Sequence, residues 1–229
     1  MEICISALLS ASSSIIGFFG LIFFQTKKRT ILLYFLYYIL LFFFVAPYIG
    51  QWVTIFLITG ACLIIWFSFH HILYIALSLV GYFICVLLNH AISIPANFAG
   101  ISIAKIQKDY FILFSLGFFL LSALVNCLIG RFLITPRITL LENCPPRFLW
   151  AFLLELLLGA CLSTFNIIYG EIVHYPIQVL TVNGILVSVL VLSSAVLFYI
   201  LYQILLQNQQ LVLQQQEQAI TQEYMTQME

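Results

Sequence analysis

Glu155 lies well inside a long apolar segment of the chain. Small and polar residues follow it at spacings of four, four, three and four, which selects one helix face: Glu155, Gly159, Ser163, Asn166 and Gly170. A charged side chain at the centre of a bilayer costs about 2.5–3.5 kcal/mol on insertion scales, so Glu155 must face protein or water. Asn126, Arg131 and Arg147 are its candidate partners. Two roles stay open for Glu155 and Asn126: a polar lock that joins two helices, or a polar switch that re-pairs when ligand binds.

A second set of polar residues falls near the other ends of the fourth, sixth and seventh apolar segments. Amide, imidazole and carboxylate side chains at the mouth of a helix bundle are suited to bind a ligand by hydrogen bonds. The candidate ligand-binding residues are Asn89, His90, Asn166, Glu171, His174 and Asn183.

Patterns for catalysis and for metal binding are missing from the sequence. It contains no GxSxG, HExxH, P-loop or Rossmann glycine motif, no CxxC, and no Cys/His cluster with zinc spacing. A cysteine nucleophile needs a neighbouring His, but His71 and Cys85 would lie about 20 Å apart along one helix. We therefore expect no catalytic residue, no metal and no cofactor.

The elements that must position these residues are membrane helices. The chain is 64% hydrophobic and 7% charged, whereas soluble domains carry about 25% charged residues. Since a helix needs roughly 20 apolar residues to cross a bilayer, we predict an all-α polytopic bundle of about seven transmembrane helices. The spans fall near 3–24, 31–48, 52–69, 72–92, 110–132, 148–169 and 179–203. A six-span alternative merges the third and fourth segments across His70 and His71.

Basic residues predict how the bundle is oriented. With seven spans, the residues Lys27, Lys28, Arg29, Arg131, Arg137 and Arg147 share one side of the membrane with the C-terminus. Positively charged loops mark the cytoplasmic side. We therefore expect a multi-pass protein of the cell membrane with its N-terminus outside and its C-terminus in the cytoplasm. The net charge of zero leaves no electrostatic footprint for nucleic acid.

Small residues also form a stripe in the first span, at Ser6, Ser10, Ser13, Gly17 and Gly20. Stripes of this kind let membrane helices pack closely, because van der Waals contact between backbones replaces the hydrophobic drive. We interpret this stripe as structural packing.

The last span continues into a Gln-rich segment without a Gly or Pro. We predict two parts: a transmembrane sensor bundle over 1–203, and a cytoplasmic signalling helix over 204–229 that is continuous with the last span. Apolar residues recur at heptad spacing in the second part, with Tyr224 at a partner position: Leu206, Leu213 and Ile220. This pattern favours a marginal two-helix contact between two copies of the chain; a helical end that is merely solvated is the alternative.

Two stretches, LVGYFICVLLN over 79–89 and EYMTQME over 223–229, carry a family resemblance, as does the layout of the whole chain. The chain resembles the sensor half of bacterial peptide-pheromone receptor histidine kinases, the accessory-gene-regulator and competence-receptor type of the GHKL family. The resemblance implies a homodimer, an extracellular peptide signal and a following kinase core. No phosphoacceptor box or ATP-binding motif is present here, so no catalytic residue is carried over and the chain itself is not expected to be an enzyme.

These patterns together predict a membrane receptor for an extracellular signal, which is relayed through the last helix to a histidine-kinase core absent from this chain. Its expected partners are the lipid bilayer, a peptide signal and a second copy of the chain. A membrane enzyme that processes a peptide, or an exporter that moves one, stays open as the alternative; it would use the intramembrane Glu155 and the polar residues near the outer ends of the spans.

Overall fold

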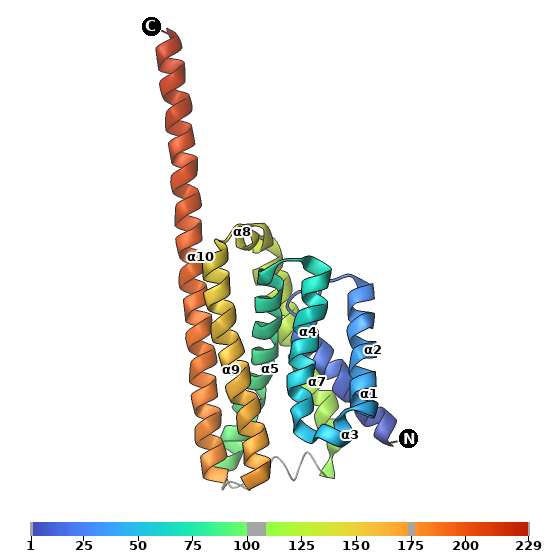
Figure 1. The fold of residues 1–229 in the computed structure, drawn as a ribbon. Coiled ribbons are helices and arrows are strands. Elements are labelled where there is room, and N and C mark those ends of the chain that lie inside the picture. The colour runs from blue at the N-terminus through green and yellow to red at the C-terminus, as the bar shows by residue number, and fades with distance from the viewer. Residues whose placement is uncertain (1, 100–108, 174–176, 229) are drawn as a thin grey trace.

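The apolar segments of the chain form separate α-helices that pack into a bundle, and the last helix projects far beyond it (Figure 1). The computed structural model describes residues 2–99, 109–173 and 177–228. Within these ranges the structure is all-α, with nine α-helices: α1 (Glu2–Phe19), α2 (Lys28–Phe44), α3 (Ala46–Ile49), α4 (Val53–Phe69), α5 (Ile72–Phe98), α7 (Phe111–Ile129), α8 (Ile138–Glu142), α9 (Pro146–Val173) and α10 (Ile177–Met228). Three short turns join them: η1 (Gly50–Trp52), the π-helical η2 (Gly130–Ile134) and η3 (Thr135–Arg137).

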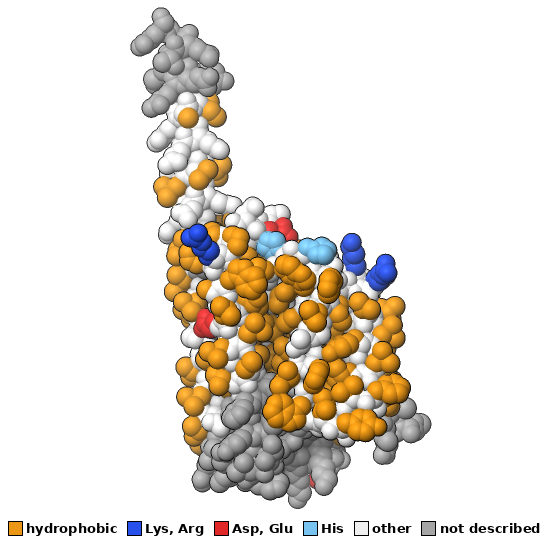
Figure 2. Space-filling model, viewed as in Figure 1, with side chains coloured by type: hydrophobic (Ala, Val, Ile, Leu, Met, Phe, Trp, Pro, Cys, Tyr) orange, Lys and Arg blue, Asp and Glu red, His pale blue; other side chains and the backbone are white. Residues whose placement is uncertain are grey.

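Three described segments are long and apolar enough to cross a bilayer, namely Ile72–Ala96, Phe111–Glu142 and Pro146–Ser163. Two shorter apolar helices cover Ala7–Phe19 and Val53–Phe69. Hydrophobic side chains cover most of the visible bundle surface, and basic side chains gather at the edge from which α10 projects (Figure 2). The chain is therefore a multi-pass membrane protein whose apolar helices contact lipid.

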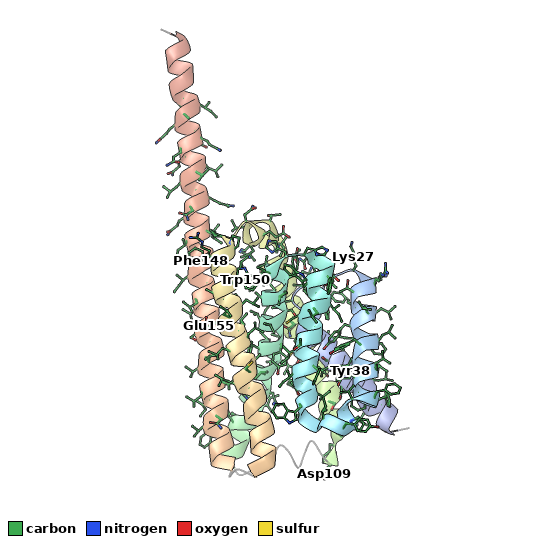
Figure 3. All side chains as sticks on the ribbon, viewed as in Figure 1. Lys27, Tyr38, Asp109, Phe148, Trp150 and Glu155 are labelled. Carbon is green, nitrogen blue, oxygen red and sulfur yellow. The ribbon has the colours of Figure 1, made fainter. Side chains whose placement is uncertain are left out.

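Figure 3 labels a residue at each end of the bundle: Lys27 at the end from which α10 projects, and Asp109 at the opposite end. We call these the tail end and the far end. The turns before α2 and α5 and the segment around α8 lie at the tail end (Figure 1). The basic turn after α1 and the segment that carries Arg131, Arg137 and Arg147 are thus at the same end of the bundle as the projecting helix.

Helix α5 occupies the centre of the bundle and contacts α1, α4, α7, α9 and α10. On its face toward α1 and α7, Gly81 is buried. A Cβ atom at Gly81 would lie 2.5 Å from the carbonyl oxygen of Gly17. The glycines of the stripe predicted in the first span, Gly17 and Gly20, are both buried, so this part of the stripe packs α1 against its neighbours.

The first predicted span, 3–24, is too long, because α1 ends at Phe19. The chain leaves the helix at Gly20, and the next two residues, Leu21 and Ile22, stay buried although they are not helical. A Cβ atom at Gly130 would lie 2.5 Å from the carbonyl oxygen of Leu21. Non-helical backbone is tolerated at membrane depth where protein covers it, and here η2 covers it.

The π-helical turn η2 is tied to the segment that leaves α1. The backbone N–H and the hydroxyl of Thr135 both donate to the carbonyl oxygen of Gly130, the hydroxyl at 2.8 Å. The side-chain amide of Gln25 in turn donates to the Thr135 hydroxyl over 2.9 Å. These bonds connect residues 110 positions apart in the sequence and fix the tail end of α7 beside the end of α1.

Helices α4 and α5 form an antiparallel hairpin around His70 and His71 (Figure 1). His70 ends α4 in the left-handed conformation, with φ of 53°, and the rings of Phe69 and Tyr74 stack across the turn at 4.1 Å. The two segments are thus separate helices rather than the single broken element of the six-span alternative.

Helix α10 is one unbroken helix of 52 residues. It packs against α9 and α5 inside the bundle, and Tyr202 and Leu205 still contact the core. From Gln207 to Thr221 every described side chain is exposed. At a rise of about 1.5 Å per residue, the part beyond Leu206 extends roughly 33 Å.

Candidate functional site

A polar contact between α5 and α10 lies toward the far end of the bundle. His90 of α5 is half-buried, and its Nδ1 lies 3.1 Å from the hydroxyl oxygen of Ser188 on α10. The Ser188 hydroxyl also donates to the carbonyl oxygen of Gly184. A Cβ atom at Gly184 would be 3.6 Å from the imidazole ring, so the ring packs directly on the α10 backbone.

Of the six residues that sequence reasoning selected for ligand binding, His90 takes part in this contact. Asn183 is half-buried and adjoins Gly184, which the His90 ring contacts. Asn89 is exposed one position before His90. The side chains of Asn166 and Glu171, and all of His174, lie outside the described residues. The contact between α5 and α10 thus includes His90, which sequence reasoning selected, and Ser188, which it did not select.

Asn126 is fully buried where α7 meets α1 and α5. Its side-chain nitrogen donates to the sulfur of Cys85 over 3.4 Å. Its Cβ atom lies 2.7 Å from the position that a Cβ atom at Gly20 would take. Among the described residues its Oδ1 has no hydrogen-bond partner. The Asn126 amide thus contacts α5 and the segment that follows α1.

Glu155 lies on α9 (Figure 3), about two and a half helical turns from the first residue of that helix, Pro146, and is half-buried. No hydrogen bond or ion pair within the described ranges joins it to Asn126, Arg131 or Arg147. Its stripe does face neighbouring helices, because Gly159 and Ser163 are buried and a Cβ atom at Gly159 would lie 2.7 Å from Leu190 of α10. Glu155 and Asn126 thus belong to different helix contacts, and any lock or switch they form is not a direct pair.

A second contact with α10, at the tail end, was missed by sequence reasoning. Arg137 of η3 donates from Nε to the hydroxyl of Tyr202 over 2.6 Å. Its guanidinium carbon lies 5.6 Å from the centre of the Tyr202 ring, which adds a cation–π contact. The only sequence signal was an Arg in a loop and a Tyr at the end of a span, which commonly lie at one interface.

The apolar heptad residues of the exposed helix are open to solvent. Leu213 and Ile220 are each more than half exposed, at 58% and 54%, whereas Leu206 is half-buried beside the bundle. The side chain of Tyr224 lies outside the described residues. Exposed apolar side chains one heptad apart are available to a partner helix.

Chemistry at a metal centre receives no support from the geometry. No group of three or more His, Cys, Asp or Glu side chains that could hold a metal ion occurs in the described ranges. The sulfur of Cys85 lies against Asn126. Near the tail end, Tyr74 donates to Glu142 over 2.7 Å, which ties α5 to α8.

Comparisons with known proteins give no relative for this chain: no protein-family model, no curated protein and no solved structure matches it.

Proposed function

We propose that the chain is a membrane sensor module that converts binding of an extracellular signal, in the resembling family a peptide, into a movement of α10. The observation that carries this proposal is the unbroken α10, which contacts His90 toward the far end, Arg137 at the tail end, and then extends as an exposed rod. Any displacement of its Ser188 turn must reach the exposed part, because a continuous helix is stiff along its axis.

The polar contacts that hold α10 to the bundle are weak enough for the helix to move between two positions. It is attached to α5 and η3 by the polar contacts of His90 and Arg137. Net hydrogen-bond contributions are about 0.5–1.5 kcal/mol each, and typical coupling free energies between sites are about 1–3 kcal/mol. A ligand that competes for His90 thus needs only ordinary differential affinity to shift α10.

The signalling proposal is tested by fusing residues 1–229 to the core of a known dimeric histidine kinase. We expect conditioned medium or extracellular peptides from the source cells to change autophosphorylation of the fusion. His90→Ala removes the hydrogen-bond partner of Ser188 on α10. The fusion that carries this substitution should therefore respond less to the signal. A fusion that does not respond, combined with peptide cleavage or efflux that is lost in Glu155→Gln, would favour the processing enzyme or exporter.

We further propose that the tail end faces the cytoplasm, with the N-terminus outside. The support is the clustering of basic residues at the end from which α10 projects (Figure 2), since positive residues favour the cytoplasmic side. With this orientation the exposed part of α10 would lie in the cytoplasm, where a kinase core could follow it. The exposed Leu213 and Ile220 would lie there too, available to a second copy of the chain.

Cysteine accessibility provides the test of orientation. In a variant without exposed native cysteines, Gly100→Cys should react with an impermeant maleimide on intact cells, whereas Leu140→Cys should react only after permeabilisation. The neighbouring Cys144 is 4% exposed and burial raises the pKa of its thiol, so it contributes little background. The reverse labelling pattern would overturn the orientation.

A further inference from the structure

An apolar cavity of about 540 Å³ lies between α5, η2, α9 and α10, on the tail side of the bundle. This volume is within the range of roughly 300–1,000 Å³ that is usual for small-molecule sites. The side chains that wall it include Leu77, Phe83, Leu87, Ile129, Phe152 and Leu156. From Leu77 to Leu87 the wall extends about 15 Å along α5, so the space suits an elongated guest.

The polar side chains in the lining of the cavity are those of Arg137, Tyr199, Tyr202 and Gln203. The Nε of Arg137 donates to Tyr202, and its Nη1 donates to the carbonyl oxygen of Leu133 over 3.1 Å and to that of Phe132 over 3.4 Å. A guanidinium has five N–H donors, and no recorded bond within the described ranges uses Nη2. No described carboxylate forms an ion pair with Arg137, so its charge is available to an anion.

We propose that this cavity binds an anionic amphiphile, with an acyl chain against the apolar walls and a phosphate or carboxylate headgroup on Arg137. Guanidinium groups bind phosphate and carboxylate in a bidentate manner. The polar part of the site lies at the tail end of the bundle, where the basic residues gather (Figure 2). This inference requires only that the bundle is in a membrane, and it is independent of the relay through α10.

Binding is measured by native mass spectrometry on the delipidated full chain in a neutral detergent. The probes are a phosphatidylglycerol, a phosphatidylcholine with the same acyl chains, and oleate. We expect one phosphatidylglycerol or one oleate per chain, bound about tenfold or more tightly than phosphatidylcholine. Whichever anionic probe binds better identifies the source of the headgroup, a phospholipid or a free fatty acid.

Two variants and a matched control distinguish binding inside the cavity from nonspecific attraction of an anionic probe to surface charge. Arg137→Gln should weaken anionic binding by about 10- to 100-fold, since hydrogen bonds to charged groups contribute that much. Val80→Phe, which adds bulk to a wall residue, should lose binding with Arg137 still present. Arg131→Gln removes the same charge from an exposed residue outside the cavity lining and should bind as the unmodified chain does.

Equal binding of the anionic and neutral probes would overturn the proposal, as would undiminished binding by Val80→Phe or an equal loss in Arg131→Gln. Failure of all three probes to bind would also overturn it. If Arg137→Gln fails to fold, the headgroup comparison on the unmodified chain and the Val80→Phe variant still decide the outcome.

Discussion

Alanine at position 81 is expected to destabilise the bundle by about 3 kcal/mol, at the upper end of what overpacking costs. The reason is that its Cβ atom would be 2.5 Å from the carbonyl oxygen of Gly17, so the backbones of α1 and α5 must move apart. Asn126 would also be disturbed, because its Oδ1 lies 3.4 Å from the same Cβ position. The measurement is a thermal or denaturant unfolding midpoint of the purified chain in detergent.

Gly117→Ala is the matched control for this experiment. Gly117 lies in α7, and a Cβ atom there would meet nothing within 4 Å in the described structure. We expect this variant to be as stable as the unmodified chain, or more stable by about 0.5–1 kcal/mol from helix propensity alone. Equal unfolding midpoints for Gly81→Ala and the unmodified chain would contradict the close approach of α1 and α5.

Proline at position 207 is expected to abolish the response of the kinase fusion to its signal. From Gln207 to Thr221 every side chain of α10 is exposed. Proline at 207 removes an intrahelical hydrogen bond and clashes with the preceding turn, at a cost of about 3 kcal/mol or more. The bundle should still fold, because its contacts end before this residue. Phosphorylation should persist at one fixed level, whether or not signal is present.

Control variants of α10 show whether the response depends on an unbroken helix or on the amino acid at the altered position. Gln207→Ala keeps the helix and should respond normally. Inserting one residue after Leu213 turns everything beyond it by about 100° and should change or invert the output, whereas inserting seven leaves a mismatch of only about 20° and should restore it. A response that survives the proline variant would show that α10 does not carry the signal.

Local properties of the sequence were enough to predict the long apolar helices, but not the short helices α3 and α8. Long apolar runs predicted helices at α5, α7 and α9 because a buried or lipid-facing helix needs no alternation of polar residues. The boundary at His70 and His71 was found from two polar residues alone, although the left-handed conformation of His70 was not. The Gln-rich segment was predicted to be helical because no Gly or Pro interrupts it, and α10 is a single helix through Met228.

Contacts between distant residues could not be predicted in the same way. The end of α1 at Phe19 depends on the approach of Gly130 to the Leu21 carbonyl oxygen, and no local pattern around residue 20 signals it. Likewise the Arg137–Tyr202 bond joins residues 65 positions apart. His90 and Asn183 were selected from the sequence for their polarity, whereas Ser188, the hydrogen-bond partner of His90, was not selected, because a lone Ser in an apolar helix carries no such signal.

The π-helical turn η2 has a geometric consequence for the residues that follow it. Its bonding from each N–H to the fifth preceding carbonyl takes in one more residue than an α-helical turn. Everything downstream is therefore swung by about 100° around the helix axis compared with an uninterrupted α7. Arg137 follows this extra residue, in the tighter turn η3, and donates to Tyr202; the azimuth of that cation is thus set by two successive departures from α-helical winding.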